Sequence, residues 1–275
     1  MPVRVAIPVP HSVNSKYSER AMPQYERAIA LVGGEPVRIP LDKSVAEVAA
    51  ILKTCDAVLL PGSPADVDPA KFGQSRSEQT AAADPQREDV DRLLLDDAYA
   101  QRKPVLGICY GLQSLNVYRQ GSLVQHIPAF LPAETRDKVD HEVGKKLTVA
   151  HTVSIEPQSK LAGLVAAPAQ LVGAADNREG HGFSRADIEQ KMTGALASEG
   201  KPLVVTVNSS HHQSADVIGN GLRIVARCPY DGIIEALEGT SPDHFVLAVQ
   251  WHPERSVDGD DVSRAIFKSL LDAAH

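Results

Sequence analysis

The sequence predicts an α/β fold with a mostly parallel central sheet and an antiparallel addition in its C-terminal half. Two observations carry this prediction. In roughly the first 120 residues, short apolar runs rich in β-branched residues alternate with amphipathic segments of helical length, which is typical of βαβ units. After about residue 122, five strand-like runs follow with few helices between them.

The N-terminal half contains four predicted strands with helices between them. The strands are expected at 3–9, 36–40, 56–62 and 103–111. The helices are expected from Pro23, in a first turn, to Gly33-Gly34, at 44–53, and from Asp84, a cap followed by Pro85, to about Gln101. Residues 63–83 are expected to form a long polar loop, because they offer no apolar periodicity.

The C-terminal half contains the strand-like runs KKLTVAHTVSIEP, KPLVVTV, LRIVARC, GIIEALEG and FVLAVQW, and a helix is expected from Asp261 to Asp272. Residues 173–202 are polar and are predicted to be an insertion or a mobile loop. Because no linker or repeat interrupts the chain, we expect a single domain over residues 1–275.

Composition excludes several classes of protein. The net charge is −7, which argues against a nucleic-acid-binding surface. No apolar run approaches the roughly 18 residues of a membrane span, and the N-terminus lacks the pattern of a signal peptide. Three cysteines cannot form a disulfide framework. We therefore expect a cytoplasmic protein that binds neither membrane nor nucleic acid.

Cys109 stands at the end of a predicted strand, in the segment Gly107-Ile-Cys-Tyr-Gly111 with helical spacing after it. This is the pattern of a nucleophile elbow, in which flanking glycines make room for a sharp turn. A thiol at a helix N-terminus is favoured as thiolate, and the N–H of Tyr110 is available to an oxyanion. The alternative is a buried structural cysteine, the interpretation that we favour for Cys55 and Cys228.

A second strand end carries a base and an acid, in the segment AVQWHPE. Pro253 favours an extended backbone at His252, so that His252 and Glu254 project to the same side. Glu254 can then orient the imidazole toward Cys109, because parallel strand ends converge at one edge of a sheet. The alternative is an ordinary loop after a strand.

These motifs resemble the class I glutamine amidotransferase superfamily. They are LLPGS (59–63), KPVLGICYGLQSLNV (103–117) and VQWHPE (249–254). Within it, the sequence is similar to the peptidase C26 branch, which includes γ-glutamyl-γ-aminobutyrate hydrolase-like proteins, through LLPGSPADVDPAKFGQ, DPQREDVD and NSSHHQ (208–213). The resemblance implies a flavodoxin-like, three-layer α/β/α sandwich.

The resemblance also implies roles for individual residues. Cys109 would be the nucleophile, His252 the base and acid, and Glu254 the group that orients the histidine. The N–H groups of Gly62 and Tyr110 would form the oxyanion hole, as glycine permits close backbone approach. The γ-glutamyl group would bind near three further residues, which are Gln113, His212 and Gln213.

No cofactor is implied, and we expect no metal: His211 and His212 have no accompanying ligand at a typical spacing. Two departures from the family pattern concern Tyr110, where Arg is common, and Gln120-Gly121, where Gly-Gly is common. Loss of that arginine would remove a charge at the pocket, which leaves the leaving group undetermined. The segment 178–191 would shape the pocket mouth.

The resulting expectation is a cysteine hydrolase that cleaves a small γ-glutamyl amide, of the γ-aminobutyrate or polyamine type, through a γ-glutamyl thioester. Three alternatives remain. One is a glutaminase subunit that delivers ammonia to a separate synthase, and another is an inactive protein that binds γ-glutamyl ligands. An α/β-hydrolase is disfavoured, because there the acid lies between nucleophile and histidine in the chain. Relatives are often dimers, so the resemblance allows a homodimer.

Overall fold

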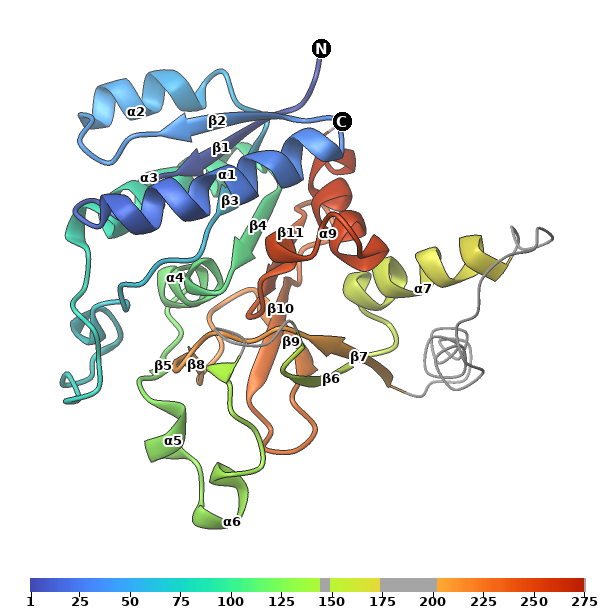
Figure 1. Cartoon of the computed structure of the whole chain (residues 1–275). Coiled ribbons are helices and arrows are strands. Elements are labelled where there is room, and N and C mark those ends of the chain that lie inside the picture. Colours follow the sequence, from blue (N-terminus) through green and yellow to red (C-terminus); the bar gives the residue numbers. More distant parts are fainter. Residues whose placement is uncertain (144–148, 174–201, 275) are drawn as a thin grey trace.

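The computed structural model describes residues 1–143, 149–173 and 202–274. A nine-stranded sheet forms its centre, in the order β2-β1-β3-β4-β11-β10-β9-β6-β7. The pairs from β2 to β11 are parallel, and the pairs from β11 to β7 are antiparallel (Figure 1). The predicted α/β class, with an antiparallel addition in the C-terminal half, is confirmed.

The strands of the large sheet are β1 (Arg4–Pro8), β2 (Glu35–Ile39), β3 (Ala57–Leu60), β4 (Val105–Ile108), β6 (His151–Ile155), β7 (Leu203–Val207), β9 (Leu222–Arg227), β10 (Ile234–Gly239) and β11 (Val246–Val249). A small second sheet pairs β5 (Leu123–Val124) with β8 (Ser214–Ala215).

The helices are α1 (Ser15–Leu31), α2 (Val45–Leu52), α3 (Pro85–Gln101), α4 (Tyr110–Tyr118), α5 (Ile127–Phe130), α6 (Ala133–Arg136), α7 (Lys160–Gly173) and α9 (Asp261–Asp272), with 3₁₀ turns at Pro69–Phe72 and Pro253–Arg255. The sequence had not predicted α5, α6, α7 or the β5–β8 pair.

The first helix corrects one prediction. Pro23 does not lie in the first turn but inside α1, which begins eight residues earlier. The Asn14 side chain caps it by accepting a hydrogen bond from the Tyr17 N–H at 3.1 Å. The apolar residues after Pro23 dominated the sequence pattern, whereas the preceding turns are largely polar and exposed. Proline marks a first turn only statistically.

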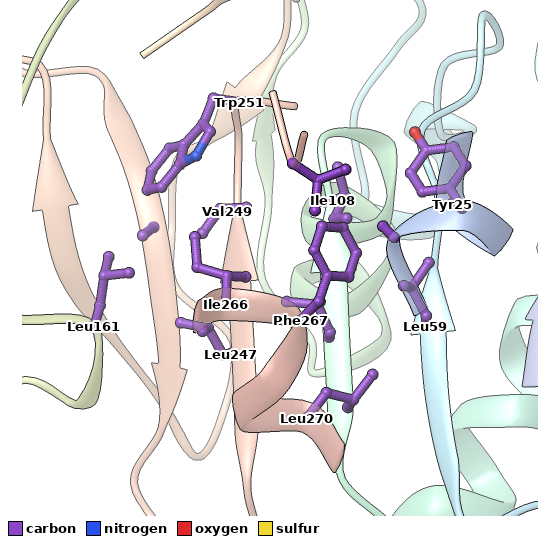
Figure 2. Close-up of a cluster of buried hydrophobic side chains, with 14 of the residues drawn as sticks. Tyr25, Leu59, Ile108, Leu161, Leu247, Val249, Trp251, Ile266, Phe267 and Leu270 are labelled. Atoms are coloured by element: carbon purple, nitrogen blue, oxygen red, sulfur yellow. The ribbon is translucent and has the colours of Figure 1, made fainter. Parts of the chain in front are cut away.

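Two apolar layers cover the sheet, as a three-layer sandwich requires. Side chains of α1, α7 and α9 form one cluster with alternate strand residues such as Val5, Ile7 and Leu59 (Figure 2). Side chains of α2, α3 and α4 form the other cluster with the intervening residues, including Ala6 and Val58. Because successive strand residues face opposite sides of the sheet, each buried strand contributes side chains to both layers.

The predicted insertion at 173–202 lies almost wholly outside the described residues. Within the part of the chain that the structure describes, no helix is long and apolar enough to cross a membrane.

Candidate active site

Cys109 lies in a strained turn between β4 and α4. Its φ of 53° and ψ of −106° fall in a region that residues with a side chain rarely adopt. The flanking glycines are needed for space. A Cβ at Gly107 would lie 2.9 Å from the main chain of Gly111, and one at Gly111 would lie 2.1 Å from the Leu60 carbonyl oxygen. This is the geometry expected of a nucleophile elbow.

The register of the sheet brings His252 to the same edge as Cys109. Strands β4 and β11 are parallel neighbours in which Ile108 pairs with Val249. The Cys109 N–H donates to the Val249 carbonyl at 2.8 Å. His252, three residues after this pair, is 2% exposed. The convergence of the two strand ends, inferred from the chain pattern, is therefore present in the structure.

Glu254 orients the imidazole of His252. The His252 Nδ1 lies 2.7 Å from the Glu254 Oε1, and both side chains are buried. Because the carboxylate holds Nδ1, Nε2 is the ring nitrogen that remains available for proton transfer. The backbone of His252 is fixed as well. The Asn208 amide donates to the His252 carbonyl at 2.8 Å and accepts from the His252 N–H at 2.9 Å.

The charge state of His252 follows from its neighbours. Burial by itself lowers the pKa of this histidine. The negative charge of Glu254 and the contact with Cys109, together with the hydrogen bonds to both residues, outweigh burial and raise the pKa of His252 to about 9. The imidazolium is therefore the prevailing form of His252 at neutral pH, paired with the Glu254 carboxylate.

Gly62 follows β3 and lies against this group. A Cβ at Gly62 would lie 3.0 Å from His252 Cε1 and 3.7 Å from the Cys109 Cβ. The Gly62 N–H does not point into open space, because it donates to the Tyr25 hydroxyl at 3.0 Å. Burial raises the pKa of Tyr25 well above its ordinary value, so this hydroxyl is neutral. An oxyanion at Gly62 would have to share or replace this hydroxyl.

The side chain of Tyr110 corrects an expectation. We expected the change from arginine to remove a charge at the pocket. The Tyr110 ring is instead buried with Ala65 and Val67 and is not among the described residues that line the cavity. The Arg87 guanidinium carbon lies 4.9 Å from the ring centroid. The backbone N–H of Tyr110 begins α4, where first-turn N–H groups lack helical partners.

A cavity of about 790 Å³ opens over Cys109 and includes Gln113, His212 and Gln213, the three predicted substrate contacts. Gln113 donates to the Gln213 carbonyl at 3.2 Å, and His212 lies 3.1 Å from the Asp66 carboxylate. The cavity has the size of a small-ligand site. Residues that follow β4 and β11, and residues of the loop after β7, line it.

Sequence reasoning missed several residues near the site, among them Asn208 and Tyr25. Asn208 begins the NSSHHQ motif, and its position just after a predicted strand was the signal that could have found it. Tyr25 is one of several apolar positions on α1, and no sequence signal separates it from an ordinary core residue.

Comparison with known proteins agrees with this architecture. The family model for Peptidase C26 matches residues 6–254. The chain is 29% identical over 254 residues to a glutamine amidotransferase-like protein of Rickettsia prowazekii, covering 91% of this chain and 87% of that one. It is 29% identical over 256 residues to the γ-glutamyl-γ-aminobutyrate hydrolase PuuD of Escherichia coli K12, covering 91% and 84%.

Solved structures share the fold. The glutaminase domain of Trypanosoma brucei CTPS, with bound acivicin, aligns with a TM-score of 0.54 at 16% identity, covering 99% of this chain and 93% of that one. PurLQS from Thermotoga maritima aligns with a TM-score of 0.52 at 16% identity, covering 99% of both. By its family match and its architecture, the chain belongs to the Peptidase C26 family of glutamine amidotransferase-like proteins.

Proposed function

We propose that the protein is a cysteine hydrolase that cleaves a γ-glutamyl amide and releases glutamate and an amine. The observation that carries the proposal is that Cys109 and His252 follow neighbouring parallel strands, with the histidine held at 2.7 Å by Glu254. Cys109 and Glu254 both line the cavity. A nucleophile, a base and a group that orients the base are the parts that acyl transfer requires.

The proposed reaction assigns one role to each of these groups. The Cys109 thiolate attacks the γ-carbonyl carbon, and the carbonyl electron pair moves to oxygen. The N–H groups of Gly62 and Tyr110 stabilise that oxyanion. When the oxyanion collapses, the carbon–nitrogen bond breaks, and the His252 imidazolium gives its proton to the departing amine. A γ-glutamyl thioester and a neutral imidazole remain.

Water completes the cycle. The neutral His252 takes a proton from water as the water oxygen attacks the thioester carbonyl. The second oxyanion collapses with expulsion of the Cys109 thiolate, and glutamate leaves. The imidazolium and the thiolate are restored, so the steps need no cofactor. We place this chemistry in the cytoplasm, where a nucleophilic thiol stays reduced.

The substrate class is proposed from the cavity and from the relatives. γ-Glutamyl-γ-aminobutyrate is the leading candidate, since relatives carry that activity in their names at 29–30% identity. The cavity contains the cations Arg20 and Arg255, which suit a leaving group with a carboxylate. It also contains Asp66, so γ-glutamyl polyamines form the second class to be tested.

The test is an amidase screen over γ-glutamyl-γ-aminobutyrate, γ-glutamyl-putrescine, glutamine and polyglutamate, with glutamate release as the readout. We expect Cys109→Ala to abolish hydrolysis and Cys55→Ala to retain it, since Cys55 lies in the core remote from the cavity. Mass spectrometry should find a single adduct of a diazo-norleucine electrophile, on Cys109. Full hydrolysis by Cys109→Ala would refute the proposal.

A further inference from the structure

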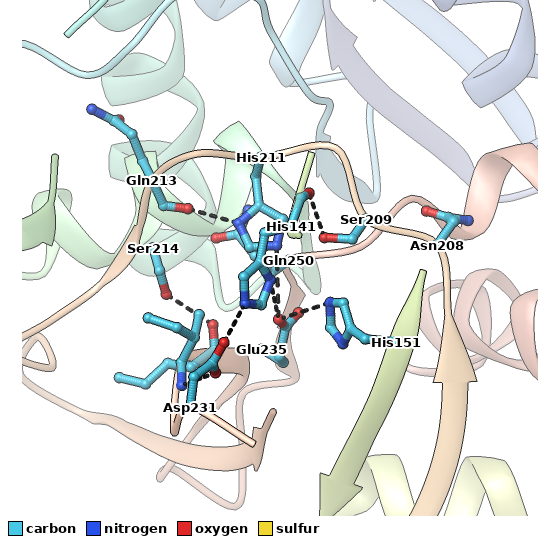
Figure 3. Close-up of polar contacts among 12 residues, drawn as sticks. His141, His151, Asn208, Ser209, His211, Gln213, Ser214, Asp231, Glu235 and Gln250 are labelled. Carbon is cyan, nitrogen blue, oxygen red and sulfur yellow. Dashed lines mark hydrogen bonds and ion pairs between the residues drawn. The ribbon is translucent and has the colours of Figure 1, made fainter. Parts of the chain in front are cut away.

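Four buried side chains meet in a cluster that Figure 3 shows, and one of them, His211, also lines the cavity. They are His141, from the segment after α6, His151 at the start of β6, His211 from the loop after β7, and Glu235 in β10. No more than 3% of any of these side chains is exposed. The potential ligand atoms of the four residues all lie within 4.8 Å of one another.

Each histidine holds one ring nitrogen in a hydrogen bond to an oxygen that can only accept. The distances are 2.9 Å from His141 Nε2 to the Asp231 carboxylate, 3.0 Å from His151 Nδ1 to the Thr152 carbonyl and 2.9 Å from His211 Nδ1 to the Gln213 carbonyl. These nitrogens must carry the hydrogen. In the neutral form of each ring, the form that binds a metal, the opposite nitrogen presents a lone pair.

The three opposite nitrogens face one carboxylate. The facing nitrogens of His141, His151 and His211 lie 3.3, 3.4 and 3.7 Å from the Glu235 Oε1. None of these nitrogens, and neither oxygen of Glu235, has a hydrogen-bond partner among the described residues. Five buried polar atoms that face one another without a hydrogen bond are costly, because nothing replaces the water that each of them has lost.

We propose that this cluster, which we call the His₃Glu site, binds one zinc ion. Ligands about 2.0–2.1 Å from a tetrahedral ion lie roughly 3.3 Å from one another, and the observed nitrogen–oxygen separations begin at that value. Three imidazoles and a carboxylate are a ligand set that zinc accepts and that calcium and magnesium do not prefer. The outer hydrogen bonds are those that orient metal-binding histidines in proteins.

The site would be structural, because four protein ligands leave no open position for water. It joins segments that are far apart in the chain. His211 lies three residues after Asn208, whose side chain clasps the His252 backbone, and next to the cavity residues His212 and Gln213. A zinc ion would fix this loop to β6 and β10, and with it the position of His252.

No metal was indicated by the sequence, because the four ligands of the His₃Glu site come from four separate segments of the chain. No two of them share the short spacing that marks a zinc motif. His211 was considered only together with its neighbour His212, which instead contacts Asp66 and His126 at the other side of the loop.

The test uses the untagged full-length protein. After chelator treatment, incubation with zinc and dialysis, we expect about one equivalent of zinc per chain by mass spectrometry of the metal. The same protein loaded with cobalt should show the intense visible bands of tetrahedral coordination. Removing zinc should lower the Tm, and returning zinc should restore it.

Variants identify the ligands. Glu235→Gln and His151→Asn should retain less than about a tenth of an equivalent of zinc, because each removes one ligand from a closed site. The matched control is His126→Asn, which alters a histidine pair outside the cluster and should bind as the wild type does. A wild-type protein that takes up less than about a tenth of an equivalent overturns the proposal. Full binding by both ligand variants also overturns it. Should these variants fold poorly, the wild-type stoichiometry and cobalt spectrum decide the question.

Discussion

Replacing Glu254 by glutamine tests whether the carboxylate holds His252 in its charged form. The His252 Nδ1 and the Glu254 Oε1 are 2.7 Å apart in a buried setting. A hydrogen bond to a charged group contributes about 1.5–3 kcal/mol. Glutamine keeps the shape of the side chain and removes the charge, so the loss falls on the imidazolium and not on packing.

The size of the effect can be worked out from this range. One pKa unit corresponds to about 1.4 kcal/mol, so the variant should lower the pKa of His252 by about one to two units. In the wild type this pKa is raised to about 9, and the imidazolium that protonates the leaving amine is lost above that pH. The alkaline limb of kcat/KM should therefore move from about 9 in the wild type to about 7–8 in the variant.

The assay is the pH dependence of kcat/KM for glutamate release from pH 5 to 10. Near pH 7, we expect kcat/KM to fall by about 10- to 150-fold, the rate equivalent of the lost hydrogen bond. Glu26→Gln is the matched control, because Glu26 forms an ion pair with Arg38 on an exposed face away from the cavity. A Glu254→Gln enzyme whose pH profile keeps its alkaline limb near 9 and whose kcat/KM equals that of the wild type would refute the reasoning.

Three further predictions concern the supports of the site. Asn208→Ala should lower kcat by about 10- to 100-fold in steady-state assays, with little change in KM, because the His252 backbone loses both hydrogen bonds to the Asn208 amide. An unchanged kcat would contradict this role. Gly111→Ala should reduce the free energy of unfolding by about 3 kcal/mol in denaturant titrations. Gly163→Ala, at an exposed position of α7 where an added Cβ meets open space, should raise it slightly, and equal effects would contradict the steric argument. Arg87→Met should cost about 3–5 kcal/mol by the same titration, because it strands a buried aspartate 2.6 Å away, and a loss under about 1 kcal/mol would contradict this.

Local signals in the sequence predicted local structure well. The expected cap at Asp84 is present, because a cap is a short-range contact between a side chain and the next turn. The meeting of Cys109 with His252 was also within reach, since both follow strands of one parallel sheet and strand ends share an edge.

Other contacts between distant segments could not be predicted from the sequence. Nothing near Tyr25 in the chain indicates that its hydroxyl accepts the Gly62 N–H, because that contact depends on how α1 packs over the sheet. The same holds for the His₃Glu site, whose members acquire their meaning only when β6 and β10 lie close together. The prediction that Pro23 lies in a first turn was wrong for a different reason. The preference of proline for the first turn is a statistical average, and α1 is an exception to it.

The hydrogen bond from Gly62 to Tyr25 has a consequence for how catalytic energy is gained. In the resting protein the Gly62 N–H already donates to a neutral hydroxyl, so the approach of an oxyanion exchanges one acceptor for another. Only the difference between the two bonds accelerates the reaction, because an interaction that is equally strong before and during the reaction lowers no barrier. A charged acceptor binds about twice as strongly as a neutral one. The Gly62 amide is thus held in position throughout, yet its hydrogen bond to the oxyanion in the transition state is stronger than its bond to the hydroxyl in the resting protein.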